Sequence, residues 1–303
     1  MKLFRDIFLV LAGVLIIGVL AYERTSEITN ESPRPVAPVF ELPEAPALTV
    51  QEPLPMTPAA NEQPEPVLPP PPAPEPKFST DELYSLGLKR MVNLLCDAPG
   101  NQVIVVSGFL ISEQGHILTN AHASDKLEEK RCQVRRGSPA RAFAVAEEIF
   151  KPLGYELGSG INEKARYDIA IWKIALPPKV EFFNLDPESP VMIGETLVAL
   201  SYPSELLGYQ TILNNLTLFS TLTTIIDADG ALIASSHTLS SQMGSSGGAL
   251  LSTFTGEPVG IIFAVAEGEN IAERTLYSVS TPAINRIVLE ETGQMLVEFL
   301  AAH

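Results

Sequence analysis

The chain has 303 residues, with 26 prolines, two cysteines and a formal net charge of −16 at pH 7. This length allows one or two domains. Phosphate binding needs a basic surface, so the acidic balance argues against nucleic acid as a partner. The two cysteines have no further ligands at suitable spacing, and we therefore expect no zinc or other metal site.

The first element is an uncharged run at 7–22, which follows Lys2 and Arg5. As a helix it would span roughly 24 Å at 1.5 Å per residue, close to the ~30 Å hydrocarbon core of a membrane. Residues 1–24 are therefore predicted to be a transmembrane anchor. A cleavable signal segment ending near Ala21 is the alternative. In both cases the basic side stays in the cytoplasm, and the rest is exported to the periplasmic or cell-surface side, or secreted after cleavage.

Residues 25–78 form the next segment, and most of the prolines lie in it, between Pro33 and Pro76. Proline fixes φ and removes a backbone donor, so the stretch favours extended polyproline II and cannot pack a core. We expect a disordered linker that separates the rest of the chain from the membrane.

A globular domain is expected from residue 79 to 303. Ser79 and Glu82 have the spacing of a capping box, which predicts a helix from there to about Arg90. Short apolar or alternating runs follow, and the 227–230 segment has the composition of a hairpin turn between two of them. Many short strands indicate an all-β sandwich or a pair of barrels. The expected strands are 103–106, 108–111, 116–119, 142–146, 169–174, 196–201, 216–225, 231–235, 259–264 and 275–279, before a closing helix at 285–300.

Three residues in this domain have the chemistry of a nucleophilic site. Ser246 lies in the glycine-rich segment GSSGG at 244–248, downstream of His122 and Asp168. A serine hydroxyl is a weak nucleophile at neutral pH and needs a base to accept its proton. An imidazole titrates near neutrality and can both accept and return that proton, while a buried carboxylate holds its productive tautomer. This ordered set predicts a hydrolase.

The glycines around the serine serve a second requirement of that chemistry. A tight turn lets the backbone N–H groups of Gly244 and Ser246 converge where a tetrahedral intermediate would place its oxyanion. Without a Cβ, Gly247 and Gly248 allow close approach of neighbouring backbone.

These segments together resemble trypsin-like serine proteases of the Deg/HtrA type. The resemblance spans about 90–288 and rests on SGFLIS at 107–112, GHILTNAH at 115–122, DIAIWKI at 168–174, GETLVALSYP at 194–203 and GEPVGI at 256–261. It implies two six-stranded antiparallel barrels, at about 91–185 and 190–285, with the active site between them. His122 and Asp168 would lie on the first barrel and Ser246 on the second.

The sequence departs from that family in two places. Ser245 stands where the Deg/HtrA pattern has Asn, so the side chain that braces the nucleophile loop is shorter. About 15 residues follow the 282–287 segment, which is too few for a PDZ domain, and we expect none.

The resemblance also implies a substrate pocket. Its lining would be Ser240 and Ser241 before the nucleophile, and Phe263, Ala264 and Val265 on the following strand. No carboxylate stands at the expected base of the pocket. Small or medium apolar substrate side chains are therefore predicted, rather than Arg or Lys.

Two further features of the domain leave alternatives. Cys96 and Cys132 bracket the His122 segment, and an exported location allows them to pair, while two buried free thiols are the alternative. His116 precedes the candidate base in a predicted turn, and we expect it to be exposed on the surface.

The sequence favours an exported, membrane-tethered serine endopeptidase that acts on protein or peptide substrates and needs no metal or organic cofactor. One alternative is a catalytically inactive member of the same fold that serves as an envelope binding or sensing module. A purely structural envelope-spanning protein is a third possibility, but it leaves the Ser-His-Asp set without a role. The sequence does not indicate an oligomeric state.

Overall fold

The computed structural model describes residues 76–100, 102–125, 127, 129–175, 179–189, 191–236, 242–265 and 274–303, without the side chains of 264 and 265. The anchor or signal segment predicted at 1–24, and the linker predicted from 25 as far as residue 75, lie outside these residues. No helix within the described part is long and apolar enough to cross a membrane.

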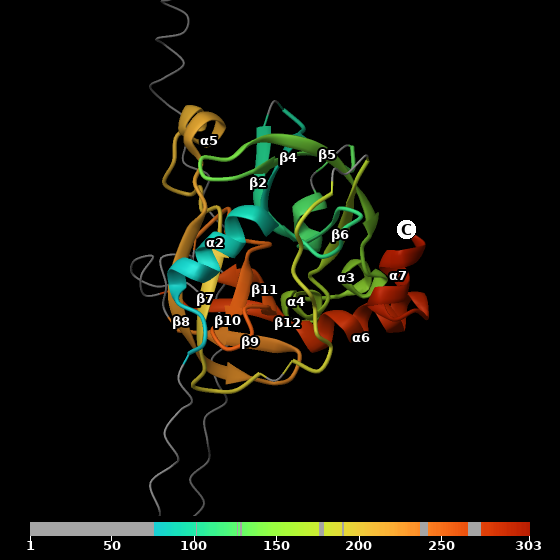
Figure 1. The fold of residues 1–303 in the computed structure, drawn as a ribbon. Coiled ribbons are helices and arrows are strands. Elements are labelled where there is room, and N and C mark those ends of the chain that lie inside the picture. The colour runs from blue at the N-terminus through green and yellow to red at the C-terminus, as the bar shows by residue number, and fades with distance from the viewer. Residues whose placement is uncertain are drawn as a thin grey trace, which may run out of the picture. The chain divides into compact units, whose positions relative to one another are not determined.

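The first half of the domain is a closed barrel of six antiparallel strands (Figure 1). Its strands lie in the order β1-β2-β3-β6-β5-β4 around the barrel. They are β1 (Met91–Ala98), β2 (Gln102–Leu110), β3 (His116–Thr119), β4 (Arg131–Arg136), β5 (Arg141–Phe150) and β6 (Ala170–Ile174). Inside the barrel, apolar side chains from every strand pack around the fully buried Trp172.

The second half is another closed six-stranded antiparallel barrel, which confirms the predicted pair. Its order is β10-β11-β12-β9-β8-β7. The strands are β7 (Thr196–Ser201), β8 (Phe219–Ala228), β9 (Leu232–Ser235), β10 (Ala249–Ser252), β11 (Pro258–Val265) and β12 (Leu276–Ser280). The predicted turn at 227–230 joins β8 to β9, which pair in antiparallel register.

Helices connect the two barrels through a shared apolar core. Helix α2 (Thr80–Arg90) begins at the predicted capping box, where Ser79 Oγ accepts the Glu82 N–H and the Glu82 carboxylate accepts the Ser79 N–H. Although α2 leads directly into the first barrel, it packs on β7 and β8 of the second (Figure 1). Gly87 allows this contact, since a Cβ there would lie 2.5 Å from Leu200 Cδ1.

The predicted closing helix at 285–300 is wrong in one respect, because the structure has two helices there. Helix α6 (Thr281–Thr292) packs on β11 and β12, and α7 (Leu296–Ala302) follows it. The break falls at Gly293, which adopts φ +72° and donates its N–H to the Leu289 carbonyl. A glycine in the left-handed region ends a helix by this bond.

Several elements have no counterpart in the sequence analysis. They are strands β1, β4 and β10, the 3₁₀ turn η1 (Ala121–Ser124), and the helices α3 (Leu153–Leu157), α4 (Ile161–Arg166) and α5 (Tyr209–Asn215). The runs predicted at 103–106 and 108–111 are one continuous strand, β2.

Candidate active site

His122 and Asp168 meet because β3 and β6 are antiparallel neighbours. The pairing of Thr119 with Ala170 brings the end of β3 beside the start of β6, so that the residues just beyond each strand come together. His122 then sits in η1, where its backbone N–H donates to Asp168 Oδ1 at 2.9 Å and its Nδ1 lies 2.6 Å from Asp168 Oδ2. The Asp168 carbonyl accepts a further bond from Asn120 Nδ2 at 2.7 Å.

This geometry fixes the tautomer of His122. An ionised carboxylate can only accept, so Nδ1 carries the proton and Nε2 keeps a free lone pair. Asp168 is 5% exposed, whereas the His122 side chain is 36% exposed and open to a reactant. Burial lowers the pKa of His122, but the charge of Asp168, its hydrogen bond and the more distant charge of Asp125 outweigh burial and raise the pKa above 6.5.

Asp125 is a second carboxylate near the imidazole that sequence reasoning missed. It accepts hydrogen bonds from Tyr155 Oη and Lys151 Nζ, each at 2.7 Å. Burial alone would raise the pKa of Asp125, but these two bonds outweigh it and lower the pKa. Asp125 lies three positions after His122, a spacing that could have marked it as a neighbour.

The loop before β10 carries the candidate nucleophile, and nearly every backbone group in it has a partner. The carbonyl of Met243 accepts the Ser204 N–H at 2.8 Å, and the carbonyl of Ser245 accepts the Gly248 N–H at 2.8 Å. The N–H groups of Ser245, Gly247 and Gly248 all donate to backbone carbonyls. The carbonyls of Gly244 and Ser246 accept hydrogen bonds from Ser107 of β2.

Two backbone donors remain in this loop, and they are those of Gly244 and Ser246. Among the described residues neither N–H has an acceptor. Buried N–H groups without a partner are rare in native proteins. In a trans peptide the C=O and N–H point in opposite directions, so the anchored carbonyls of Met243 and Ser245 turn both N–H groups to the other side. The sequence assigned an oxyanion hole to these same two donors.

Gly247 brings the loop against the first barrel. It has φ +82°, and a Cβ there would lie 2.6 Å from Thr119 Oγ1 and still closer to the Ser107 carbonyl oxygen. A side chain at position 247 would not fit against β2 and β3. Glycine therefore allows the Ser246 loop to lie next to β3, the strand that leads to His122.

No hydrogen bond involves Ser246 Oγ within the described part of the chain, so none joins it to His122 Nε2. Ser246 is half-buried. Catalytic hydrogen bonds are often long in resting enzymes and tighten when substrate binds.

Ser245 is 1% exposed, and its Oγ accepts the Ser201 hydroxyl at 3.1 Å. The bond ties the loop to the end of β7 in the same barrel.

The predicted substrate-binding residues are only partly described. Ser240 and Ser241 lie outside the described residues, as do the side chains of Ala264 and Val265, whose backbone belongs to β11. Phe263 is half-buried, and its ring centroid lies 6.5 Å from that of Tyr277.

Cys96 and Cys132 form a disulfide with a Cα–Cα distance of 4.4 Å. The bridge joins β1 to β4 on the first barrel. Within the part of the chain that the structure describes, no group of three His, Cys, Asp or Glu residues is arranged to hold a metal ion.

His116 is not at the surface, so that prediction is wrong. It is fully buried, with Nδ1 2.6 Å from Ser112 Oγ and Nε2 3.1 Å from Lys173 Nζ. An ammonium can only donate, so Nε2 accepts and Nδ1 donates to Ser112. Burial, and then the charges of Lys173 and His303, lower the pKa of His116 to about 4.

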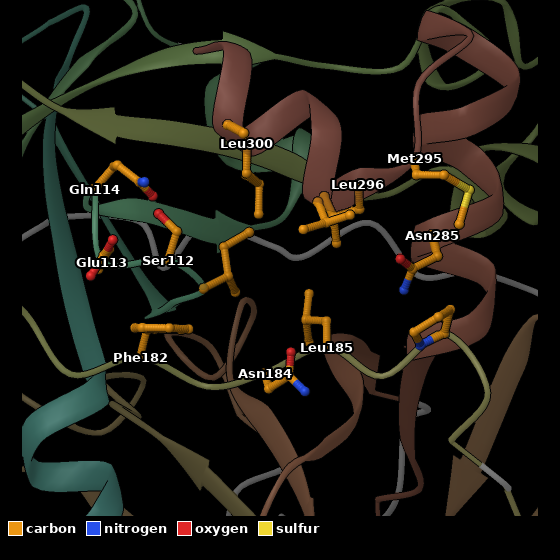
Figure 2. A pocket seen from close by; sticks show the side chains of 14 residues that line it. Ser112, Glu113, Gln114, Phe182, Asn184, Leu185, Asn285, Met295, Leu296 and Leu300 are labelled. Carbon is orange, nitrogen blue, oxygen red and sulfur yellow. The ribbon is translucent and has the colours of Figure 1, made fainter.

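A cavity of about 380 Å³ lies elsewhere, between the β2–β3 turn, the segment after β6 and the C-terminal helices (Figure 2). Leu185, Leu296 and Leu300 give it an apolar wall, and Ser112 and Asn285 contribute polar groups. None of the predicted catalytic residues lines it.

Comparison with known proteins gives one family. The model of the trypsin-like peptidase domain matches residues 106–261, more than half of the chain. A comparison with curated protein sequences finds no significant match.

Three solved structures to which the chain is similar are distant in sequence. An HtrA-type protease with a bound tripeptide is 18% identical with a TM-score of 0.52, over 72% of this chain and 65% of that one. The active form of a protease from M. tuberculosis is 19% identical with a TM-score of 0.50, over 77% and 95%. A serine endoprotease from Yersinia pestis is 22% identical with a TM-score of 0.49, over 71% and 67%.

Proposed function

This chain belongs to the family of trypsin-like peptidase domains, and on that premise we propose that it is a serine endopeptidase whose nucleophile is Ser246. The observation that carries the proposal is the pair of N–H groups of Gly244 and Ser246, neither of which has an acceptor among the described residues. Two such donors beside a serine hydroxyl can stabilise an oxyanion, and each commonly contributes roughly 3 kcal/mol to transition-state stabilisation.

In the proposed mechanism Ser246 Oγ attacks the carbonyl carbon of the scissile peptide bond, while His122 Nε2 accepts the hydroxyl proton. The imidazolium is stabilised by Asp168, which already accepts the Nδ1 proton. The carbonyl oxygen becomes an oxyanion that accepts from Gly244 and Ser246. As the intermediate collapses, the C–N bond breaks and His122 returns its proton to the leaving amine.

The acyl-enzyme is then hydrolysed by the same groups. His122 accepts a proton from water, the hydroxide attacks the ester carbon, and the second tetrahedral intermediate uses the same two N–H donors. Its collapse releases the carboxylic acid and returns the proton to Ser246 Oγ. The raised pKa of His122 suits both steps, because the imidazole must gain and lose a proton near neutral pH.

A trypsin-like pseudoprotease that serves as an envelope binding or sensing module is the second candidate. It is favoured by the Ser246 hydroxyl, which makes no hydrogen bond to His122 among the described residues, and by Ser245 in place of the family's Asn. This reading retains the fold but has no turnover.

A fluorophosphonate probe distinguishes the two candidates, because it reacts only with an activated serine. A peptidase is labelled as wild type and not as Ser246→Ala. The matched control is Ser278→Ala, which removes a fully buried hydroxyl that has no partner in the described structure and should leave labelling intact. A folded wild type that is not labelled would support the pseudoprotease.

We further propose that the protease domain is tethered outside the cytoplasm. The uncharged run at 7–22 behind Lys2 and Arg5 supports this location, as does the disulfide, because such bridges persist in oxidising compartments. Protease added to intact cells or spheroplasts should digest the domain, and carbonate washing should leave it in the membrane fraction. A domain that resists digestion until the cells are lysed would contradict the proposal.

Substrate preference is proposed for small or medium apolar side chains at the cleaved position. A panel of peptides that differ only at that residue tests it. Strong preference for Arg or Lys would show that an acidic group outside the expected pocket lining sets the specificity.

A further inference from the structure

Ser107 connects the first barrel to the nucleophile loop through its hydroxyl and its backbone N–H. It is fully buried in β2. Its hydroxyl donates to the Gly244 carbonyl at 2.7 Å and accepts the Tyr202 N–H at 2.8 Å. Its own N–H donates to the Ser246 carbonyl at 2.7 Å, and its carbonyl accepts from Thr119 Oγ1 at 2.8 Å. Ser107 is therefore bound on both sides of the candidate nucleophile.

The hydroxyl bond acts on the most adaptable residue of the loop. Gly244 has φ +90° and no Cβ, so its two flanking peptide planes can rotate at low steric cost. The Met243 carbonyl, held by Ser204, fixes the plane that carries the Gly244 N–H. The Gly244 carbonyl, held by Ser107, fixes the next plane. With both planes held, the dihedral angles of Gly244 are fixed, and its N–H can point in only one direction.

The side chain at position 245 does not make this connection. Among the described residues, Ser245 Oγ bonds only to Ser201, which belongs to the second barrel. In the part of the chain that the structure describes, the hydrogen bond from the Ser107 hydroxyl is thus the one side-chain bond that joins this loop to the barrel that carries His122.

We propose that Ser107 is a positioning residue for the oxyanion hole, holding the Gly244 carbonyl so that the Gly244 N–H faces the substrate oxygen. The proposal rests on the peptidase function proposed above. Ser107 touches no reacting atom, and it acts through Gly244.

Ser107→Ala should therefore slow chemistry more than it weakens binding. Loss of one oxyanion donor commonly costs about 10²–10³ in rate, and a donor that is present but free to turn should lose part of that, about 10–100-fold. Ground-state binding uses the hole little, so affinity should stay within about threefold.

The test is saturation kinetics of fluorophosphonate labelling of the full chain, because the probe forms a tetrahedral adduct whose oxygen occupies the hole. Ser107→Ala should lower the maximal rate of inactivation about 10–100-fold and leave the half-saturating concentration within about threefold. Ser278→Ala is the matched control for loss of a buried serine hydroxyl and should react as wild type. If Ser107→Ala does not fold, Ser107→Cys, a weaker donor of similar shape, should show an intermediate loss of rate.

Each outcome has one meaning. Labelling of wild type with an unchanged rate in Ser107→Ala, or in Ser107→Cys where the alanine variant does not fold, overturns the role of Ser107 and leaves the peptidase intact. Equal losses in Ser107→Ala and Ser278→Ala also overturn it, because any buried hydroxyl would then matter. Absence of labelling in folded wild type instead rejects the peptidase itself.

Discussion

Acid should destabilise this protein through His116. The folded state holds the pKa of this buried imidazole at about 4, whereas an unfolded chain titrates near 6.5. The unfolded state therefore binds the proton first as pH falls. The resulting stability is fully present above pH 6.5 and is lost progressively as pH falls to about 4. A gap of about 2.5 pKa units corresponds to about 3 kcal/mol of unfolding free energy.

His116→Gln isolates this contribution. Glutamine does not titrate, and its carbonyl oxygen can still accept from Lys173. Urea unfolding of wild type and variant between pH 4 and pH 7.5 should give profiles that diverge, with wild type losing about 3 kcal/mol more. In melting temperature the extra loss is about 6–12 °C for a domain of this size. Acidic residues elsewhere titrate in both proteins and cancel in the difference.

Lys173→Met separates the charge of Lys173 from the other causes of the low pKa of His116. Burial is the larger cause of the low pKa of His116, and the charge of Lys173 is a smaller one. Removal of the ammonium should therefore reduce the acid-dependent loss without abolishing it. Parallel profiles for wild type and His116→Gln would refute the reasoning, because the imidazole would then titrate alike in the folded and unfolded states.

Three further predictions concern the site and the scaffold. Because Asp168 raises the pKa of His122 above 6.5 against the effect of burial, kcat/KM should reach half of its maximum above pH 6.5, and a half-maximum well below that pH would contradict this. Asp168→Asn should lower kcat by about four orders of magnitude. Gly247→Ala should abolish labelling by fluorophosphonate. The control Gly100→Ala has a similar φ of +76° but nothing within 4 Å of the added Cβ, and it should keep the labelling. Equal effects of the two variants would show that backbone strain alone is responsible. Replacement of both cysteines by serine removes a bridge across a separation of 36 residues and should cost about 4 kcal/mol in urea unfolding, and an unchanged midpoint would argue against the chain-entropy account.

Elements with strong local signals were predictable from the sequence. Strands β3 and β7 have the predicted bounds, because each is a short apolar run between turn residues. The start of α2 follows from its capping box. These features depend on neighbours within a few positions, and that information is present in any single sequence.

Elements that depend on barrel closure or on tertiary contacts were not predictable in this way. Strand β1 follows α2 without a turn signal, and it is a strand because β2 and β4 pair with its two edges. Strand β4 is rich in arginine, and the same closure determines it. Helix α3 has only five residues, too few to be stable alone, and its Gly154 N–H donates to Glu291 of α6.

The candidate site likewise has one part that is predictable from the sequence and another that depends on tertiary contacts. The identities of His122, Asp168 and Ser246 follow from the chemistry of their residue types and from the segments around them. The contact between Ser107 and Gly244 spans 137 positions, and no local pattern marks Ser107 as a partner of that loop. His116 reads as a turn residue from its neighbours, but the pairing of β3 with β6 places it against Lys173 inside the protein.

Ser245 illustrates how the structure changes an argument made from sequence. A shorter side chain before the nucleophile suggests a weakened oxyanion hole if that side chain orients the loop. In this structure the carbonyls from Met243 to Ser246 are all held by other donors: Ser204, Ser107, Gly248 and Ser107 again. Two of these four bonds come from the first barrel. The direction of the proposed oxyanion donors therefore depends on the packing of one barrel against the other, and we expect a change at that interface to affect catalysis more than a change at position 245.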